Sequence, residues 1–198
     1  MNIEMYRVTR ELPGGQSGIW KVQKYTVTEK DEKFQRLRCA INPHREQRFV
    51  PAGEYTQLVK GGTIIMSDTP DEIYDQYPLL YAAHGNVLIN GLGLGCTIKM
   101  CMSKPEVTHV TVVEIDPDVI RLTGDFWKQK YKDRLTIINA DAFDYKPAKG
   151  SYFGAVWHDI WDNICGDNLP EMSKLHRRYG RMSTWQGSWG RILCKQGR

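Results

Sequence analysis

Apolar and polar residues alternate differently in the first third of the chain and in the remainder. Residues 18–28 (GIWKVQKYTVT) alternate with a period of about two, which predicts a half-buried strand. Residues 55–67 (YTQLVKGGTIIMS) predict two short strands around Lys60-Gly61-Gly62, a hairpin signal. We therefore expect a small N-terminal β-rich region over residues 1–67.

A helix is expected over residues 67–83 (SDTPDEIYDQYPLLYAA). Asp68 or Thr69 can cap its first turn, and Pro70 suits the first helical position. Pro78 lies inside the pattern and should kink or split the helix, because proline cannot donate the backbone hydrogen bond.

From residue 86 the pattern changes to apolar strands that alternate with helices. Continuous apolar runs are typical of parallel strands that are covered on both faces. Such alternation predicts an α/β fold with a doubly wound, mostly parallel sheet over residues 68–198, shortened toward residue 198. The expected strands are 86–90, 109–116, 135–143 and 153–161, and the expected helices are 96–104, 117–131 and 168–182, with Pro117 at the start of the second and Asn168 capping the third.

Composition changes this picture little. No apolar run approaches the roughly 20 residues of a membrane helix, and the first residues lack an apolar signal core, so we expect a cytoplasmic protein with no membrane partner. Five cysteines without regular pairing favour reduced thiols and no metal site. The net charge of +4 permits an anionic partner, and residues 174–181 (KLHRRYGR) fit a solvated helix face better than a nucleic-acid contact. The sequence leaves open whether the protein forms a homo-oligomer.

The glycines Gly91, Gly93 and Gly95 directly follow the first apolar strand. Two interpretations are open: a turn that lets a ligand approach the backbone at a helix N-terminus, or a tight packing corner. Glu114 lies 19 residues after Gly95, at the end of the next strand, where an acid can accept hydrogen bonds from ribose hydroxyls. This order of strand, glycines and acid favours nucleoside binding.

Two further strand ends carry acids. Asp141, followed by Ala142, can accept a hydrogen bond from an adenine amino group, although a simple turn former is nearly as good an interpretation. Asp159 ends the fourth strand, with His158 and Asp162 beside it, and a carboxylate there can orient an amine or act as a base. A structural histidine is the more common alternative for His158. The two indoles of residues 185–189 (WQGSW) are core by default, with a stacking platform as the alternative.

These motifs together resemble class I S-adenosylmethionine-dependent methyltransferases, and within that superfamily the spermidine synthase-like proteins. The resemblance covers roughly residues 55–165. It rests on "INGLGLG", "VVEID", "NADAF", "FGAVWHD" and the hairpin-helix stretch "GGTIIMSDTPDEIYDQY".

The resemblance implies a small-molecule nucleoside cofactor, S-adenosylmethionine or its decarboxylated form. It implies that the glycines border the methionine part, that Glu114 holds the ribose, and that Asp159 faces the reacting centre. The cofactor-binding residues are then Gly91, Gly93, Gly95, Glu114, Ile115, Asp141, Ala142 and Asp159, and the catalytic candidates are Asp159, His158 and Asp162.

Three positions depart from the synthases. Leu94 replaces an aspartate in the glycine turn, Met66 replaces a glutamine of the hairpin, and Asp75-Gln76-Tyr77 lacks an amine-binding glutamate. Methyl transfer to an unidentified acceptor is therefore the leading expectation. The alternatives are aminopropyl transfer from the decarboxylated cofactor, and a non-catalytic binding or regulatory protein that keeps the fold.

Overall fold

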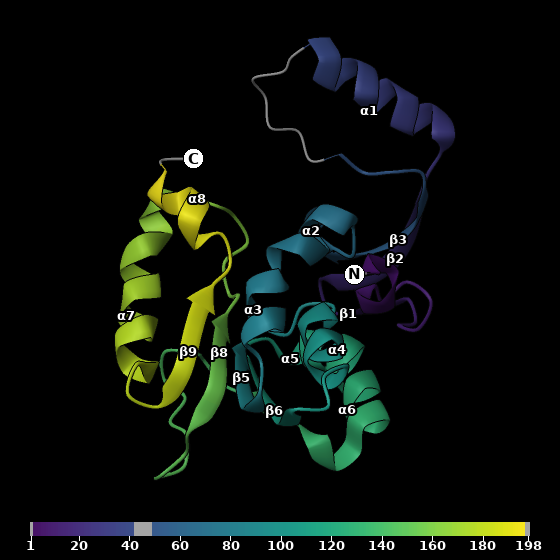
Figure 1. Cartoon of the computed structure of the whole chain (residues 1–198). Helices are drawn as coiled ribbons and strands as arrows, with labels where there is room; N and C mark the ends of the chain where they lie inside the picture. Colours follow the sequence, from purple (N-terminus) through teal and green to yellow (C-terminus); the bar gives the residue numbers. More distant parts are fainter. Residues whose placement is uncertain (1, 42–48, 197–198) are drawn as a thin grey trace.

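The computed structural model describes residues 2–41 and 49–196, and its strands form two sheets (Figure 1). The first sheet is antiparallel, in the order β1-β2-β3-β4. Its strands are β1 (Gly15–Ser17), β2 (Trp20–Val27), β3 (Gly53–Lys60) and β4 (Thr63–Ser67). The predicted alternating strand and the hairpin are both present, and Gly61 and Gly62 form the turn with φ of 54° and 91°.

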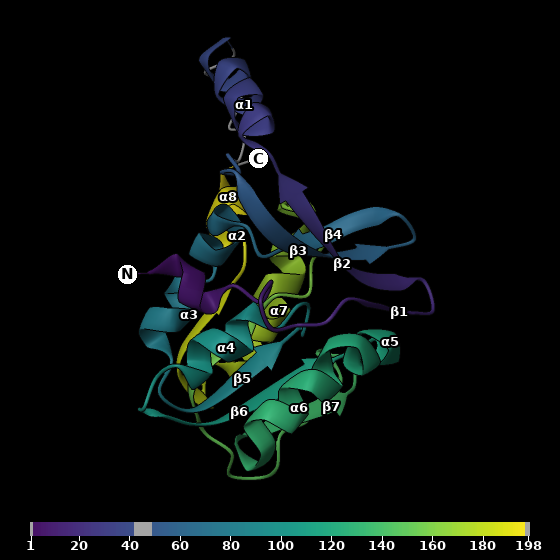
Figure 2. The ribbon, with the colours of Figure 1, turned by 90° about the vertical axis from the view of Figure 1, so that its right-hand side faces the viewer.

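The N-terminal region also contains helix, which the sequence analysis did not anticipate. A short 3-10 helix, η1 (Ile3–Tyr6), precedes the sheet, and α1 (Glu29–Ile41) connects β2 to β3. No residue of α1 is buried, and the helix stands away from both sheets (Figure 2). The region is thus β-rich with an inserted helix. The domain boundary at residue 67 stays a prediction.

The second sheet confirms the predicted α/β class. Its five strands pair in parallel in the order β7-β6-β5-β8-β9. They are β5 (Gly85–Asn90), β6 (Val107–Glu114), β7 (Leu135–Asn139), β8 (Phe153–His158) and β9 (Ser183–Ser188). The chain winds outward in both directions from β5, so the strand order reverses between β5 and β8. In open α/β sheets, ligands bind at such a switch point, beyond the carboxyl ends of the strands.

Strand β9 was not predicted, because its residues Ser183–Ser188 lack an apolar run. The indole of Trp185 stacks on that of Trp157 with ring centroids 6.0 Å apart. Trp185 is half-buried and packs against the core, so only part of its side chain is interior. Trp189 lies one residue beyond the strand.

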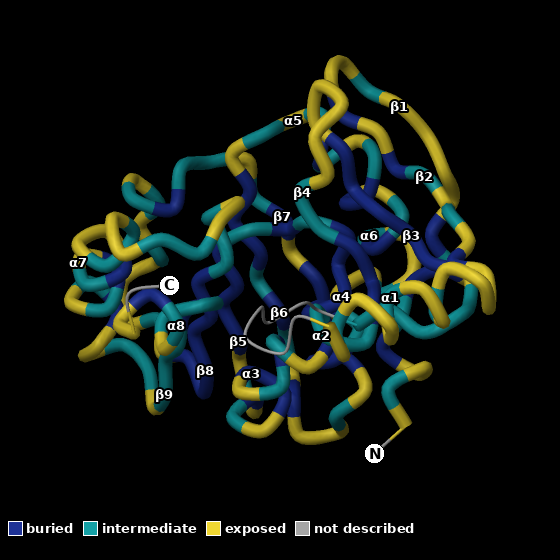
Figure 3. The backbone as a smooth tube through the Cα atoms, turned by 90° about the horizontal axis from the view of Figure 1, so that it is seen from above, coloured by how far each residue is buried: buried dark blue, intermediate teal, exposed yellow. Residues whose placement is uncertain are grey.

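Helices cover both faces of the parallel sheet. One face packs against α3 (Tyr77–Ala82), α4 (Cys96–Met102) and α6 (Asp125–Tyr131), and the other against α7 (Leu169–Tyr179). The middle strands are the most buried part of the chain (Figure 3). The remaining helical elements are α2 (Pro70–Asp75), α5 (Pro117–Val119), the π-helical η2 (Ile120–Gly124), the 3-10 turns η3 (Lys132–Arg134) and η4 (Gly166–Asn168), and α8 (Arg191–Lys195).

Pro78 splits the predicted helix into α2 and α3, as expected. The expected capping role of Asp68 is wrong, because its buried carboxylate accepts hydrogen bonds from the backbone N–H groups of Val8, Thr9 and Thr56. Thr69 occupies the cap position without a side-chain hydrogen bond. Asp68 therefore fastens the N-terminal segment to β3.

Asn168 occupies the cap position of α7, but its side-chain amide donates to the carbonyl of Asn163 instead of capping the helix.

Among the described residues, no helix is long and apolar enough to cross a membrane.

Candidate nucleoside-binding site

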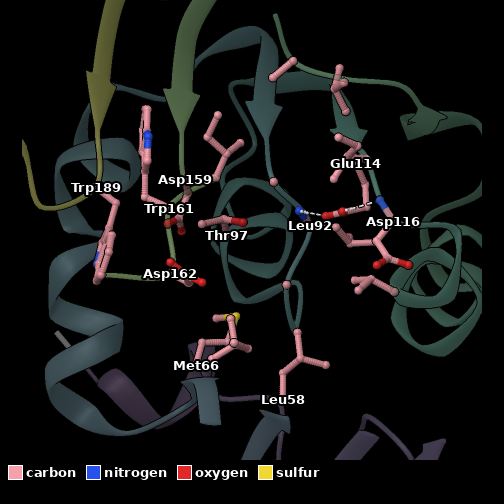
Figure 4. Close-up of a pocket in the computed structure, with 18 of the residues that line it drawn as sticks. Leu58, Met66, Leu92, Thr97, Glu114, Asp116, Asp159, Trp161, Asp162 and Trp189 are labelled. Carbon is pink, nitrogen blue, oxygen red and sulfur yellow. Dashed lines mark hydrogen bonds between the residues drawn. The ribbon is translucent and has the colours of Figure 1, made fainter. Parts of the chain in front are cut away.

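A cavity of about 710 Å³ opens beyond the carboxyl ends of the parallel strands (Figure 4). The glycine turn and the ends of β6 and β8 form one side, and Leu58 and Met66 of the N-terminal sheet face them. The cavity is large enough for a nucleoside with a short tail, since ligand pockets usually measure about 300–1,000 Å³. The two sheets therefore form the site together.

The three glycines of the turn have φ of 101°, 51° and 82° at Gly91, Gly93 and Gly95. Only glycine adopts such angles without strain. A Cβ atom at Gly91 would overlap the carbonyl oxygen of Asp159, and one at Gly95 would overlap the indole of Trp127. Gly91 and Gly93 line the cavity, whereas Gly95 faces the packed interior. The packing interpretation therefore holds at all three glycines, and the ligand-approach interpretation stays a prediction for Gly91 and Gly93.

Met66 occupies the space above the middle of the turn. Its sulfur accepts a hydrogen bond from the backbone N–H of Leu94 at 3.3 Å, and a Cβ atom at Gly93 would overlap that sulfur. The side chain of Leu94 is fully buried. This end of the cavity is consequently apolar.

We expect Gly93→Val to lower the free energy of unfolding as well as ligand affinity. The substitution combines a strained φ with an overlap on Met66, and together these should cost about 1–3 kcal/mol. Urea unfolding measures the loss. In the matched pair Gly93→Ala and Gly93→Ala/Met66→Ala, the second variant should recover part of the stability. Wild-type stability of Gly93→Ala would contradict the packing described here.

Glu114 ends β6, and its side chain is buried. One carboxylate oxygen accepts from the N–H of Leu92 at 2.9 Å, and the other accepts from the N–H of Asp116 at 2.8 Å. Burial raises the pKa of Glu114, while these backbone hydrogen bonds oppose the rise. Each oxygen keeps a lone pair for a further donor. The carboxylate is thus fixed at the cavity wall in an orientation that suits two hydroxyl groups.

The next candidates lie along the same edge. Ile115 is 66% exposed and lines the cavity, so an apolar side chain is available to a planar base. Asp141 also lines the cavity, and one of its oxygens accepts from the N–H of Phe143 at 2.7 Å. Ala142 is buried beside it. Asp141 is therefore a turn former with its second oxygen still available.

Asp159 follows β8 at the switch point and lines the cavity. Its Oδ2 accepts from the side-chain amide of Gln76 at 3.0 Å. Burial is the main cause that raises its pKa to about 7; Glu72 and Asp75 add to the rise, and Gln76 opposes it. A carboxyl group that titrates near neutral pH is suited to exchanging a proton.

We expect the stability of the wild type relative to Asp159→Asn to fall as pH rises from 5 to 8. The pKa of Asp159 is about 7 in the folded chain, against an ordinary value of 3.8. The folded state therefore holds the proton more tightly, and the resulting stabilisation is lost as pH rises through 7. Urea unfolding of both proteins at pH 5 and pH 8 checks the sign. A difference that does not change with pH would contradict the elevated pKa.

The other two catalytic candidates, His158 and Asp162, differ from Asp159 in their position relative to the cavity. The ring of His158 is fully buried on the face of β8 turned away from the cavity, and burial is the main cause that lowers its pKa to about 3. A neutral, fully buried ring has no access to an acceptor in the cavity. Asp162 is exposed and lines the cavity.

Several lining residues were not selected from the sequence. Gln76 contacts Asp159 from 83 positions away, and Trp161 donates from its indole to the carboxylate of Glu171 at 2.9 Å. The indole of Trp189, which is labelled in Figure 4, donates to the carboxylate of Asp75 at 3.1 Å. The signals in the sequence for these contacts were the position of Trp161 between Asp159 and Asp162 and the stacking-platform alternative for Trp189.

Seven of the eight charged side chains in the described cavity lining are acidic. Lys60 is the only lysine or arginine there, and its ammonium lies 5.0 Å from the centroid of the Trp20 ring. Such a lining favours cationic ligands. The acids are Glu72, Glu114, Asp116, Asp141, Asp159, Asp162 and Glu171. The described residues contain no cluster of three or more potential metal ligands.

A parallel sheet with this switch point, a glycine turn after its central strand and an acid after the neighbouring strand define a Rossmann-like fold. Comparison with known proteins agrees. Polyamine aminopropyltransferase 1 of Streptomyces coelicolor is 33% identical over 133 residues, which cover 62% of this chain and 24% of that protein. The corresponding Prochlorococcus marinus enzyme is 28% identical over 137 residues, covering 62% of this chain and 47% of the relative.

Polyamine aminopropyltransferase 1 of Hyperthermus butylicus is 27% identical over 177 residues, covering 82% of this chain and 57% of the relative. The chain thus spans between a quarter and just over half of the length of these relatives. No protein-family model matches the chain. The resemblance to the class I S-adenosylmethionine-dependent superfamily, and within it to spermidine synthase-like proteins, is confirmed.

One solved structure with a partly similar backbone is the spermidine synthase of Thermotoga maritima. Its TM-score is 0.45 and its sequence identity 17%, over 83% of this chain and 52% of that one. An N-methyltransferase of Bradyrhizobium japonicum in complex with S-adenosyl-L-homocysteine has a TM-score of 0.47 and 16% identity over 64% of this chain and 66% of that one.

Proposed function

We propose that the cavity binds an adenosyl sulfonium of the S-adenosylmethionine type, and that the protein transfers one of its alkyl groups to an amine acceptor. The observation that carries the proposal is the placement of Glu114 and Asp159 on the wall of one acid-rich cavity at the switch point. Glu114 offers fixed acceptors for ribose hydroxyls, and Asp159 offers a group that can take a proton.

In this proposal, the ribose lies against Glu114 and the adenine extends toward Ile115, Asp141 and Ala142. The sulfonium then points toward Asp159. Ile115 supplies an exposed apolar side chain that suits the face of adenine, and Asp141 supplies a carboxylate oxygen that suits its amino group.

The acceptor nitrogen attacks the carbon bonded to sulfur, and the electron pair of the breaking C–S bond returns to sulfur. The sulfonium thereby becomes a neutral thioether, and the nitrogen gives up a proton. Asp159 is the proposed acceptor of that proton, because its pKa of about 7 allows it to be ionised at neutral pH and protonated afterwards. Most of the acceleration comes from holding nitrogen, carbon and sulfur in line.

Aminopropyl transfer is the transfer that this lining favours. The decarboxylated donor carries two positive charges and no carboxylate, whereas S-adenosylmethionine adds a carboxylate that the described lining can match only with Lys60. The curated relatives are also named polyamine aminopropyltransferases. Methyl transfer, the leading expectation from the sequence, is the second candidate, since Leu94 replaces the aspartate expected for aminopropyl transfer.

The test is to incubate the protein with each donor and with a panel of diamines, and to identify the nucleoside product. Aminopropyl transfer releases 5′-methylthioadenosine, and methyl transfer releases S-adenosylhomocysteine. The first product should form, in an amount that depends on the diamine. Tight binding of a donor without either product would favour the third alternative, a non-catalytic binding protein.

A further inference from the structure

A row of buried polar side chains runs along the carboxyl ends of the parallel strands, from the central strand β5 to the edge strand β9, just behind the cavity. Asn90, His158 and Ser188 end β5, β8 and β9, and they are paired in register. The first two are fully buried and Ser188 is 8% exposed. Successive residues of a strand point to opposite faces, so the residue after each member of the row faces the other way.

Those following residues are Gly91, Asp159 and Trp189, and all three line the cavity. The backbone N–H of Asp159 donates to the carbonyl of Asn90 at 2.8 Å, and that of Trp189 donates to the carbonyl of His158 at 2.9 Å. These are the last hydrogen bonds before the chain leaves the sheet. The position of the row therefore sets the position of the cavity wall.

One side-chain hydrogen bond links the row across β5 and β8. Nδ2 of Asn90 lies 2.8 Å from Nδ1 of His158. In this orientation of the Asn90 amide, Nδ1 accepts the hydrogen bond and the ring proton lies on Nε2. The ring also packs against His176 and Tyr179 of α7, with centroid separations of 5.3 Å and 5.6 Å. His158 is thus held from β5 and from α7.

A buried polar side chain costs free energy unless it is hydrogen-bonded, by about 1–3 kcal/mol in proteins. The preceding residues of β8, Phe153–Trp157, are apolar or glycine, so packing alone does not call for a histidine at this position. The hydrogen bond of His158 lies at the last rung of the β5–β8 pairing, directly before Asp159. The imidazole therefore stabilises the pairing of β5 and β8 at the residue before Asp159.

We infer that His158 is a positioning residue, which through its hydrogen bond to Asn90 holds the Asp159 carboxyl in the cavity beside Gln76. This inference deepens the proposed function, from which Asp159 takes its role. The position of the carboxyl is measurable without any donor or acceptor, so the two claims fail separately.

The experiment is an NMR titration of the ligand-free protein with 13C-labelled aspartate carboxyl groups, in which the Asp159 signal is assigned by its loss in Asp159→Asn. The groups that act on this carboxyl are Glu72, Asp75 and Gln76 of the α2–α3 region and Trp157 of β8, and all four are kept unchanged. The wild-type pKa should be about 7. In His158→Leu, which keeps the volume and removes the hydrogen bond, the pKa should fall below about 5, toward the value of a solvated aspartate.

His158→Asn places an amide oxygen where Nδ1 accepts, so this conservative variant should keep the pKa within about one unit of the wild type. Ser188→Ala is the matched control, because it removes a buried hydrogen bond of the same row, 2.8 Å from Ser188 Oγ to Nε2 of His176, without touching the Asn90–His158 link. It should lower the melting temperature and leave the pKa of Asp159 unchanged.

A purely structural role would lower the melting temperature of His158→Leu and leave the pKa of Asp159 near 7, which would overturn the inference. If the pKa of Asp159 fell as far in His158→Asn as in His158→Leu, the inference would also be overturned, because His158→Asn keeps the hydrogen-bond acceptor. If His158→Leu does not fold, Asn90→Leu breaks the same hydrogen bond from the other strand and should give the same low pKa.

Discussion

Replacing Asp159 with asparagine should lower turnover by about 10²- to 10⁴-fold while the affinity for the donor changes by no more than a few-fold. A positioned acid–base group usually contributes a factor of this size. The substitution keeps the size of the side chain and its contact with Gln76, but removes the group whose pKa of about 7 suits proton exchange. Single-turnover rates with a diamine, measured beside calorimetric donor affinity, separate the two effects.

The matched control is Asp162→Asn. Asp162 lines the same cavity but is exposed, so its loss should mainly weaken acceptor binding and reduce turnover far less at saturating amine. Full turnover of Asp159→Asn would show that the acceptor loses its proton to water or to another group. Equal losses in both variants would show that the cavity acts by its overall negative charge.

Replacing Glu114 with alanine should weaken nucleoside binding by about 1.5–3 kcal/mol, which corresponds to about 10- to 150-fold in Kd. Two ribose hydroxyls would lose a charged acceptor, and the N–H groups of Leu92 and Asp116 would lose their partner. Calorimetric titration of both proteins with 5′-methylthioadenosine, which has no charged tail, measures this loss without a contribution from the tail.

Glu114→Gln separates the two parts of this loss. The amide oxygen can still accept from one backbone N–H, so stability should be closer to the wild type while the nucleoside still loses a charged acceptor. Thermal unfolding of both variants provides the control for folding. Wild-type affinity in a folded Glu114→Ala protein would mean that the ribose is held elsewhere or that no nucleoside binds.

The sequence predicted the parallel part of the fold because its strands are continuous apolar runs, such as Val87–Ile89, separated by helices with clear starts. Helix α1 was missed although Phe34, Leu37 and Ile41 recur at helical spacing, because its remaining residues are mostly charged and none of its residues is buried. Strand β9 was missed because Ser183–Ser188 is a polar segment that is a strand through its pairing with β8. Strand β9 is therefore decided by pairing and not by local residue preferences, whereas α1 consists of good helix formers.

The site was predictable where it depends on order along the chain. Glycines after one strand and acids after the next three must meet at one sheet edge, so Glu114, Asp141 and Asp159 line one cavity. Contacts from distant segments were not predictable. The contact of Gln76 with Asp159 spans 83 positions, and that of Met66 with Leu94 spans 28. The burial of His158 depends on α7, which follows it in the chain.

The most direct test of the central claim is a crystal structure of the protein with 5′-methylthioadenosine bound. The account predicts that the nucleoside occupies the cavity beyond the carboxyl ends of the parallel strands. Its ribose hydroxyls should lie within hydrogen-bond distance of the Glu114 carboxylate, about 2.5–3.0 Å, and its sulfur should face Asp159. A nucleoside bound outside this cavity, or one whose ribose does not contact Glu114, would contradict the account.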